Sequence, residues 1–149
     1  MELKHIAIEE RAALLPDLLD VWESSVRATH DFLRKGDVDF LRPYVAQGLK
    51  EIPILLCALE GSRPLAFLGM AGDSIEMLFV QAGLRHCGIG SALMREALEL
   101  GACHVDVNEQ NPQALGFYQH FGFEVASRDE VDSLGLPYPI LHCALPEKG

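Results

Sequence analysis

The sequence predicts a mixed α/β fold built around one β-sheet, and the order of its segments is the basis of that prediction. Three strand-like segments follow one another between residues 54 and 80, which favours an antiparallel meander. A strand, a glycine-containing loop, a helix and another strand follow between residues 74 and 107. This second arrangement favours one right-handed parallel crossover, so parallel and antiparallel strands are expected in the same sheet.

The first third of the chain is expected to form a strand and two helices. Residues 3–8 alternate enough for a strand, and residues 11–29 carry apolar side chains at helical spacing. The apolar face of this first helix consists of Leu14, Leu18, Val21, Trp22 and Val26. A second helix is expected to begin at Asp37, a suitable N-cap, although Pro43 leaves the position of its first turn open. Its apolar face consists of Leu41, Val45, Leu49 and Ile52.

The remaining segments complete the order β-α-α-β-β-β-α-β-α-β-β. Residues 60–64 have turn composition and join two strands into a hairpin. Asn111 followed by Pro112 is typical of a helix start, and Gly122 is expected to end that helix. Strands are expected over residues 54–59, 65–70, 74–80, 102–107, 123–127 and 140–145, and helices over residues 88–100 and 112–120.

Length and charge favour a single-domain protein that does not bind nucleic acid. The chain has 149 residues, enough for a single domain spanning residues 1–149, and 49% of them are hydrophobic. Its N-terminus lacks an uninterrupted apolar stretch, so we expect a cytoplasmic protein with no membrane contact. The formal net charge of −10 disfavours nucleic-acid binding. An acidic surface suits a cationic partner, although acidity also simply keeps proteins soluble.

The four cysteines indicate neither a zinc site nor a disulfide framework. None of them forms a close-spaced Cys-x-x-Cys pair, which structural zinc sites usually contain. We expect no metal and no disulfides, with Cys57, Cys103 and Cys143 as buried thiols in strands.

The segment Arg85-His86-Cys87-Gly88-Ile89-Gly90 lies between a predicted strand and a predicted helix. Glycines at a helix start let the backbone approach a ligand closely, and the free amides there favour an anion such as pyrophosphate. Arg85 and His86 can add positive charge. A dinucleotide fingerprint needs a further glycine where Leu93 stands, and the Gly-Lys-Ser/Thr of a P-loop is absent.

Two blocks of the sequence resemble the GCN5-related N-acetyltransferase family. Residues 85–90 match the family pattern Gln/Arg-x-x-Gly-x-Gly/Ala. A second family block is matched by Asn111, Ala114, Phe117, Tyr118, Gly122 and Phe123. The flanking residues 25–33 and 135–139 resemble a narrower bacterial branch, the YjaB-like acetyltransferases. The resemblance implies the acyltransferase fold of that family, with two parallel strands that splay apart at the site of acetyl-CoA.

The resemblance also implies how acetyl-CoA is held. Backbone amides of residues 85–91 would bind its pyrophosphate, and its pantetheine arm would lie between the strands ending at Val80 and Val107. The amide near Val80 is the expected oxyanion donor. The residues expected to contact acetyl-CoA are Leu78, Phe79, Val80, Arg85, His86, Cys87, Gly88, Ile89, Gly90, Ser91, Asn108, Asn111, Phe117 and Tyr118. Asn111 is equally explained as a helix N-cap, and Leu78 and Val80 as core residues.

Three residues are candidates for proton transfer in attack of an amine on a thioester. Tyr118 is the candidate acid for the leaving thiolate, or a buried tyrosine that anchors a helix. Glu76 is the candidate base, on the same strand face as Leu78 and Val80 by alternation, or a residue that only faces solvent. His30 is the rival base, or a structural histidine.

The sequence does not identify the substrate that accepts the acetyl group. An amine of a small molecule or of a protein fits the reaction, and Tyr138 in the turn 135–139 is a candidate lining residue of its pocket. His120 stands where many relatives have a basic residue near the cofactor's 3′-phosphate, so the location of that contact stays open. The alternative functions are a non-catalytic module that binds acetyl-CoA or CoA, and a binding protein for another phosphorylated ligand. We expect a monomer or a homodimer.

Overall fold

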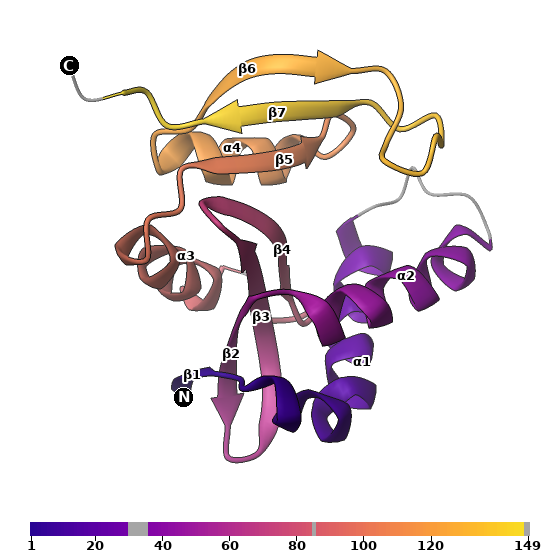
Figure 1. The fold of residues 1–149 in the computed structure, drawn as a ribbon, viewed down its shortest axis with the longest axis vertical. Helices are drawn as coiled ribbons and strands as arrows, with labels where there is room; N and C mark the ends of the chain where they lie inside the picture. The colour runs from indigo at the N-terminus through magenta and orange to yellow at the C-terminus, as the bar shows by residue number, and fades with distance from the viewer. Residues whose placement is uncertain (30–35, 85, 148–149) are drawn as a thin grey trace.

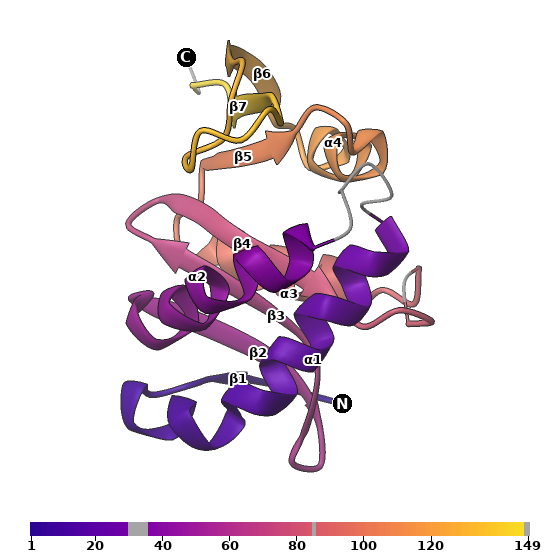
Figure 2. The ribbon, with the colours of Figure 1, turned by 90° about the vertical axis from the view of Figure 1, so that its right-hand side faces the viewer.

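The computed structural model describes residues 1–29, 36–84 and 86–147, which form a sheet with helices on both of its faces (Figures 1 and 2). The strands are β1 (Glu2–His5), β2 (Ile54–Glu60), β3 (Arg63–Ala71), β4 (Ser74–Val80), β5 (His104–Asn108), β6 (Glu124–Asp129) and β7 (Ile140–Ala144). The helices are α1 (Arg11–Thr29), α2 (Asp37–Glu51), α3 (Ile89–Glu99) and α4 (Pro112–His120), and a short 3-10 helix, η1, spans Ile8–Glu10. This order of helices and strands is the expected one.

The seven strands lie in the order β1-β2-β3-β4-β5-β7-β6. Strands β1 to β4 form antiparallel pairs, as do β5 with β7 and β7 with β6. The pair of β4 with β5 is parallel, and α3 makes the connection between them. The expected mixed sheet, with a meander and one parallel crossover, is therefore confirmed.

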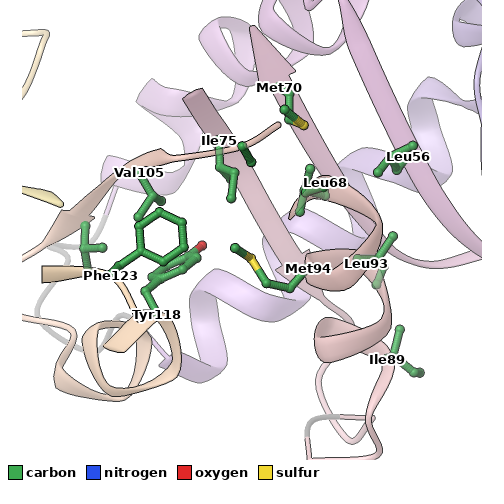
Figure 3. Close-up of a cluster of buried hydrophobic side chains, with 14 of the residues drawn as sticks. Leu56, Leu68, Met70, Ile75, Ile89, Leu93, Met94, Val105, Tyr118 and Phe123 are labelled. Atoms are coloured by element: carbon green, nitrogen blue, oxygen red, sulfur yellow. The ribbon is translucent and has the colours of Figure 1, made fainter. Parts of the chain in front are cut away.

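The two faces of the sheet carry two separate hydrophobic cores. Helices α1 and α2 cover one face, and α3 lies on the other (Figure 1). The α1/α2 core contains Leu18, Trp22, Val26, Leu49, Leu55, Cys57 and Phe67 among its buried residues. The α3/α4 core contains Leu68, Ile75, Leu93, Met94, Val105, Tyr118 and Phe123 (Figure 3). Successive residues of β2 alternate between the two cores, as the pleat of a strand requires.

Buried Arg11 ties the first helix to the end of the second. Its guanidinium donates to the carbonyl oxygen of Leu49 at 3.1 Å and also to that of Ile52. Its Nε donates to the carbonyl oxygen of Ile6 at 3.4 Å. The charge therefore satisfies carbonyl groups that the end of α2 leaves without intrahelical partners.

Three local predictions were wrong. The first strand ends at His5 rather than residue 8, because the Glu10 carboxylate accepts the Ala7 amide at 3.2 Å and stabilises the start of η1. The N-cap of α2 is Gly36, at φ 96°, and Asp37 is the first helical residue. Cys103 is half-buried and precedes β5, because the Ala102 amide still bonds the Ala97 carbonyl as part of the turn after α3.

Candidate active site

Strands β4 and β5 are paired only where they begin. Their register consists of Ser74 with His104 and Ile75 with Val105. Beyond these pairs β4 continues beside β3 and β5 continues beside β7, so the edges that face each other separate. A cavity of about 110 Å³ lies in this region, lined by Glu76, Leu78, Val107, Asn108, Asn111 and Tyr118 among others. A polar chain entering the gap can bond to the exposed strand edges as an added strand would.

The glycine loop lies beside the end of β4. Gly88 is the N-cap of α3 at φ 84°, a conformation that favours glycine, and its cap carries no side-chain hydrogen bond. The first amides of α3 lack intrahelical acceptors, as in any helix start. A Cβ on Gly90 would lie 3.6 Å from Val80 Cγ2 and 3.7 Å from Phe117 Cζ. The start of α3 therefore packs closely against both β4 and α4.

A larger cavity of about 260 Å³ connects this loop to the gap between the strands. It is lined by Ser25, Leu78, Phe79, Val80, Leu84, His86, Gly88, Gly90, Ser91, Asn111, Gln113, Ala114, Phe117 and Tyr118. Leu78, Phe79, Asn111, Ala114 and Tyr118 line the smaller cavity as well, so the two form one continuous cleft. A largely apolar cleft that ends at a helix N-terminus suits a long ligand with an anionic end.

Most of the residues expected to contact acetyl-CoA line this cleft. Cys87 is exposed in the loop and Ile89 is buried in the α3/α4 core, and neither is among its lining residues. Their expected contribution is through backbone amides. Arg85, an expected pyrophosphate contact, and His30, the rival base, lie outside the described residues.

The asparagines near α4 have structural contacts and also line the cleft. The Asn111 side chain accepts the Ala114 amide at 3.2 Å, so the N-cap interpretation is confirmed. The Asn108 side chain accepts the Gln110 amide at 2.9 Å in the turn that leads into α4. An asparagine side chain has one oxygen acceptor with two lone pairs and two N–H donors, so a bond to the protein does not exclude a contact with a ligand.

Tyr118 is buried, as expected of a tyrosine that anchors a helix, and it also borders the cleft. It is 7% exposed and its ring makes edge contacts with Phe117 and Phe123 at centroid distances of 5.3 and 6.0 Å. It also lines both parts of the cleft, and its hydroxyl points away from α4 toward Met94 (Figure 3). Burial, with a smaller contribution from Cys143, raises the pKa of Tyr118, so the phenol keeps its proton at neutral pH.

Glu76 does not share the face of Leu78, contrary to the prediction from alternation. Gly69 pairs with Met77 and Met70 pairs with Ile75, so Glu76 is the extra residue of a β-bulge. Ile75 and Leu78 both pack in the α3/α4 core, whereas Met77 packs in the α1/α2 core. The bulge directs Glu76 to the α1/α2 face, toward the charge of Asp106.

The surroundings of Glu76 favour the neutral form of its carboxyl. Burial and the neighbouring Asp106 charge raise the pKa of Glu76. His142 bonds Asp106 through Nδ1 at 2.6 Å and Asp129 through Nε2 at 2.7 Å. Hydrogen bonds to Asp129 and to Asp106 raise the pKa of His142, which favours an imidazolium between two carboxylates. Acidic groups therefore surround the gap on the α1/α2 face.

Sequence reasoning missed several contacts of this face. Ser24 Oγ accepts the Ala82 amide at 3.0 Å and joins α1 to the loop after β4, while neighbouring Ser25 lines the larger cavity. The Tyr138 hydroxyl donates to the Asp37 carboxylate and ties the segment before β7 to the start of α2. Both serines lie on the predicted first helix, but only the helix packing shows that Ser24 meets the loop after β4 and that Ser25 lines the cleft.

Comparisons with known proteins identify the family of this chain. A family model described as an acetyltransferase (GNAT) domain matches residues 53–125. The chain is 40% identical over 129 residues to the peptidyl-lysine N-acetyltransferase YjaB of Escherichia coli strain K12, covering 86% of this chain and 88% of that protein. It is also 40% identical over 130 residues to YjaB of Salmonella typhimurium, covering 87% and 90% of the two chains.

Solved structures give the same result for the fold. The solution structure of apo-form YjaB from Escherichia coli superimposes with a TM-score of 0.85 at 38% identity, covering 97% of each chain. The PaiA N-acetyltransferase of Thermoplasma acidophilum, solved with coenzyme A, has a TM-score of 0.65 at 18% identity and covers 95% of this chain and 98% of its own. At 18% identity, the similarity to this second structure shows a shared fold and nothing more.

Proposed function

Because this chain belongs to the GNAT acetyltransferase family and is an N-acetyltransferase, we propose that it transfers the acetyl group of acetyl-CoA directly to the side-chain amine of a protein lysine. The observation that carries the proposal is the continuous cleft from the start of α3 to the gap between β4 and β5. The lysine acceptor rests on the names of the two YjaB relatives and on the acidic face beside Glu76.

The residues of the cleft fit acetyl-CoA along its length. The free amides at the start of α3, from Gly88 to Ser91, suit the pyrophosphate. The separated edges of β4 and β5 suit the amides of the pantetheine arm, which can bond to backbone N–H and C=O groups. Phe117 supplies an apolar wall between these two regions. Bound there, acetyl-CoA supplies an activated acetyl group.

We assign proton transfer to groups on opposite faces of the gap. Glu76 accepts the acceptor's proton, directly or through water, because its bulge faces the α1/α2 side and its raised pKa makes it a stronger base. Tyr118 donates its proton to the departing sulfur from the α4 side. The amide near Val80 donates a hydrogen bond to the carbonyl oxygen as negative charge develops there. We favour Glu76 over His30 as the base because Glu76 lines the gap and lies near the charge of Asp106.

The acidic face gives a physical reason for a cationic acceptor. Asp106 and Asp129 lie on the side of the gap away from α3 and α4, and the chain carries a formal net charge of −10. Such a field attracts an ammonium group and raises its local concentration. No helix in the described part of the chain has the length and apolarity to cross a membrane. We also propose that one acetyltransferase domain carries out the reaction in the cytoplasm, as a monomer or homodimer.

Thermal unfolding followed by an acceptor panel tests this proposal. Acetyl-CoA at about 100 times its Kd stabilises a protein by about 2.7 kcal/mol, on the order of a 5–10 °C rise in midpoint. Adenosine diphosphate and a dinucleotide serve as controls. Lysine peptides, small polyamines and peptides with a free N-terminus then compete as acceptors. Transfer to lysine side chains supports the proposal, and stabilisation without transfer to any amine contradicts it in favour of a non-catalytic binding module.

A further inference from the structure

A second group of metal-binding side chains lies at the other end of β4 and β5. Among the described residues, Asp73, Cys103 and His104 offer ligand atoms that all lie within 4.8 Å of one another. Cys103 Sγ is 3.3 Å from Asp73 Oδ2, and His104 Nε2 is 3.9 Å from the same oxygen. We propose that these three side chains form a zinc site with one solvent-facing coordination position.

The backbone holds the three ligands in place. The amides of Cys103 and His104 both donate to the Asp73 carbonyl, at 2.8 and 3.1 Å. The Cys103 carbonyl accepts the Leu145 amide at 2.9 Å. Asp73 belongs to the turn between β3 and β4, and His104 begins β5. Two segments 30 residues apart are therefore fixed beside each other by main-chain bonds, and only side-chain rotation is needed to close on an ion.

The ligand types and spacings suit Zn²⁺. Thiolate, imidazole and carboxylate are its ordinary protein ligands, with bonds of roughly 2.0–2.3 Å in tetrahedral geometry. Those bond lengths place neighbouring ligand atoms roughly 3.3–3.7 Å apart, which the cysteine–aspartate distance of 3.3 Å already meets and the histidine–aspartate distance of 3.9 Å approaches. Magnesium and calcium prefer all-oxygen sites, so the thiol selects against them.

Binding of Zn²⁺ replaces the proton that the Cys103 thiol donates to the Asp73 carboxylate. The Cys103 thiol donates a hydrogen bond to the Asp73 carboxylate at 3.3 Å. On binding, the S–H bond breaks, an S–Zn bond forms and one proton is released to solvent. The ion then lies between two negative ligands and one neutral imidazole.

The position of this site gives it a role distinct from acetyl transfer. His104 pairs with Ser74 at the closed end of the parallel pair, and the gap opens after the pair of Ile75 with Val105. A bound ion would join the β3–β4 turn to the start of β5. It would therefore hold together the end of the pair from which the two strands diverge, outside the cleft that receives acetyl-CoA.

Titration of the reduced protein with Co²⁺, a spectroscopic substitute for Zn²⁺, tests the site without acetyl-CoA. We expect a thiolate-to-metal charge-transfer band, tetrahedral ligand-field bands, saturation at one ion per chain, and displacement by Zn²⁺. Cys103→Ala should abolish the charge-transfer band. His104→Gln and Asp73→Asn, both at exposed positions, should each weaken affinity at least about tenfold. Circular dichroism of each variant verifies folding.

The exposed Cys87 provides the matched control, because Cys87→Ala removes a thiol at a distant loop. This variant should keep the band and the stoichiometry. Absence of a thiolate band in the unsubstituted protein would overturn the proposal. So would a band that persists in Cys103→Ala, disappears in Cys87→Ala, or is insensitive to both His104→Gln and Asp73→Asn.

Discussion

The cofactor half of the molecule and its acceptor half are encoded in different ways. In the cofactor half, from β4 to α4, the important features are backbone ones: a positive-φ glycine before α3, an Asn-Pro helix start, and strand edges that separate. In the acceptor half, formed by α1, α2, β6 and β7, the important features are contacts between distant residues. Tyr138 meets Asp37 across 101 positions, and Arg11 on α1 meets Leu49 on α2 across 38. Local sequence motifs therefore predict the cofactor half, whereas the contacts of the acceptor half cannot be predicted from them.

Tyr118→Phe is the substitution with the largest expected effect, because it removes the proposed acid while keeping the buried ring and its aromatic contacts. General acid catalysis contributes about 10²–10⁴-fold, so we expect kcat to fall by at least about 10²-fold. The KM for acetyl-CoA should change less than about threefold, since the cleft wall remains. Steady-state kinetics with a lysine peptide measure both.

Phe117→Leu is the matched control for Tyr118→Phe, since it alters a neighbouring wall of the cleft without removing a proton donor. We expect it to raise the KM for acetyl-CoA more than it lowers kcat. An unchanged kcat in Tyr118→Phe would remove this residue from the proposed mechanism.

Arg11→Ala examines how far the acceptor half depends on long-range contacts. The side chain is 2% exposed and donates to carbonyl groups of the β1–η1 connection and of the end of α2. Its loss leaves buried carbonyl groups without partners and a cavity, so the free energy of unfolding should fall by about 3 kcal/mol. Urea denaturation measures this difference.

Arg27→Ala on the same helix is the control for Arg11. Its side chain is 60% exposed and faces Glu23 at 3.7 Å, a surface pair that contributes little. The stability change should stay below about 0.5 kcal/mol. Equal effects of the two substitutions would contradict the anchoring role of Arg11.

The contrast between Tyr118 and Arg11 shows why more of the cofactor half than of the acceptor half could be predicted from the sequence. The glycine before α3 and the α4 N-cap at Asn111 follow from local chemistry, and both helices begin close to where expected. The side to which Glu76 points depends on one bulge opposite β3, which shifts the alternation of β4 and leaves no mark in β4 itself. The partners of Arg11 required the tertiary packing of α1 against α2.

Tyr138→Phe tests whether the acceptor half binds the acceptor, by comparing its effect on the KM for a lysine peptide with its effect on the free energy of unfolding. Its hydroxyl donates to Asp37, and removing that bond should cost about 1–2 kcal/mol because a charged acceptor is involved. We expect the KM for a lysine peptide to rise several-fold while acetyl-CoA binding is unchanged. Tyr44→Phe on α2, whose side chain is 53% exposed, should leave both quantities unchanged. A Tyr138 variant that weakens acetyl-CoA binding instead would contradict the division into two halves.

The pH dependence of His142 is the smallest predicted effect. Its folded pKa is raised above the unperturbed 6.5, so its stabilising contribution is full below pH 6.5 and disappears as pH rises through the folded value. The stability difference between the unsubstituted protein and His142→Gln should therefore shrink with rising pH. In NMR titrations, Asp129→Asn should lower the His142 pKa.

The neighbouring substitution Glu130→Gln removes the same charge one residue along and serves as the control for Asp129→Asn. It should shift the His142 pKa less than Asp129→Asn does. A stability difference that grows with rising pH would contradict the proposed imidazolium between Asp106 and Asp129.

Hydrogen exchange with and without acetyl-CoA tests the central claim most directly. If acetyl-CoA occupies the cleft between β4, β5 and the start of α3, amides of residues 76–80 and 88–91 should exchange more slowly when it is present. The protection of β2, which pairs on both sides with β1 and β3, should stay the same. Protection confined to other segments, or no change under saturating acetyl-CoA, would contradict the assignment of this cleft.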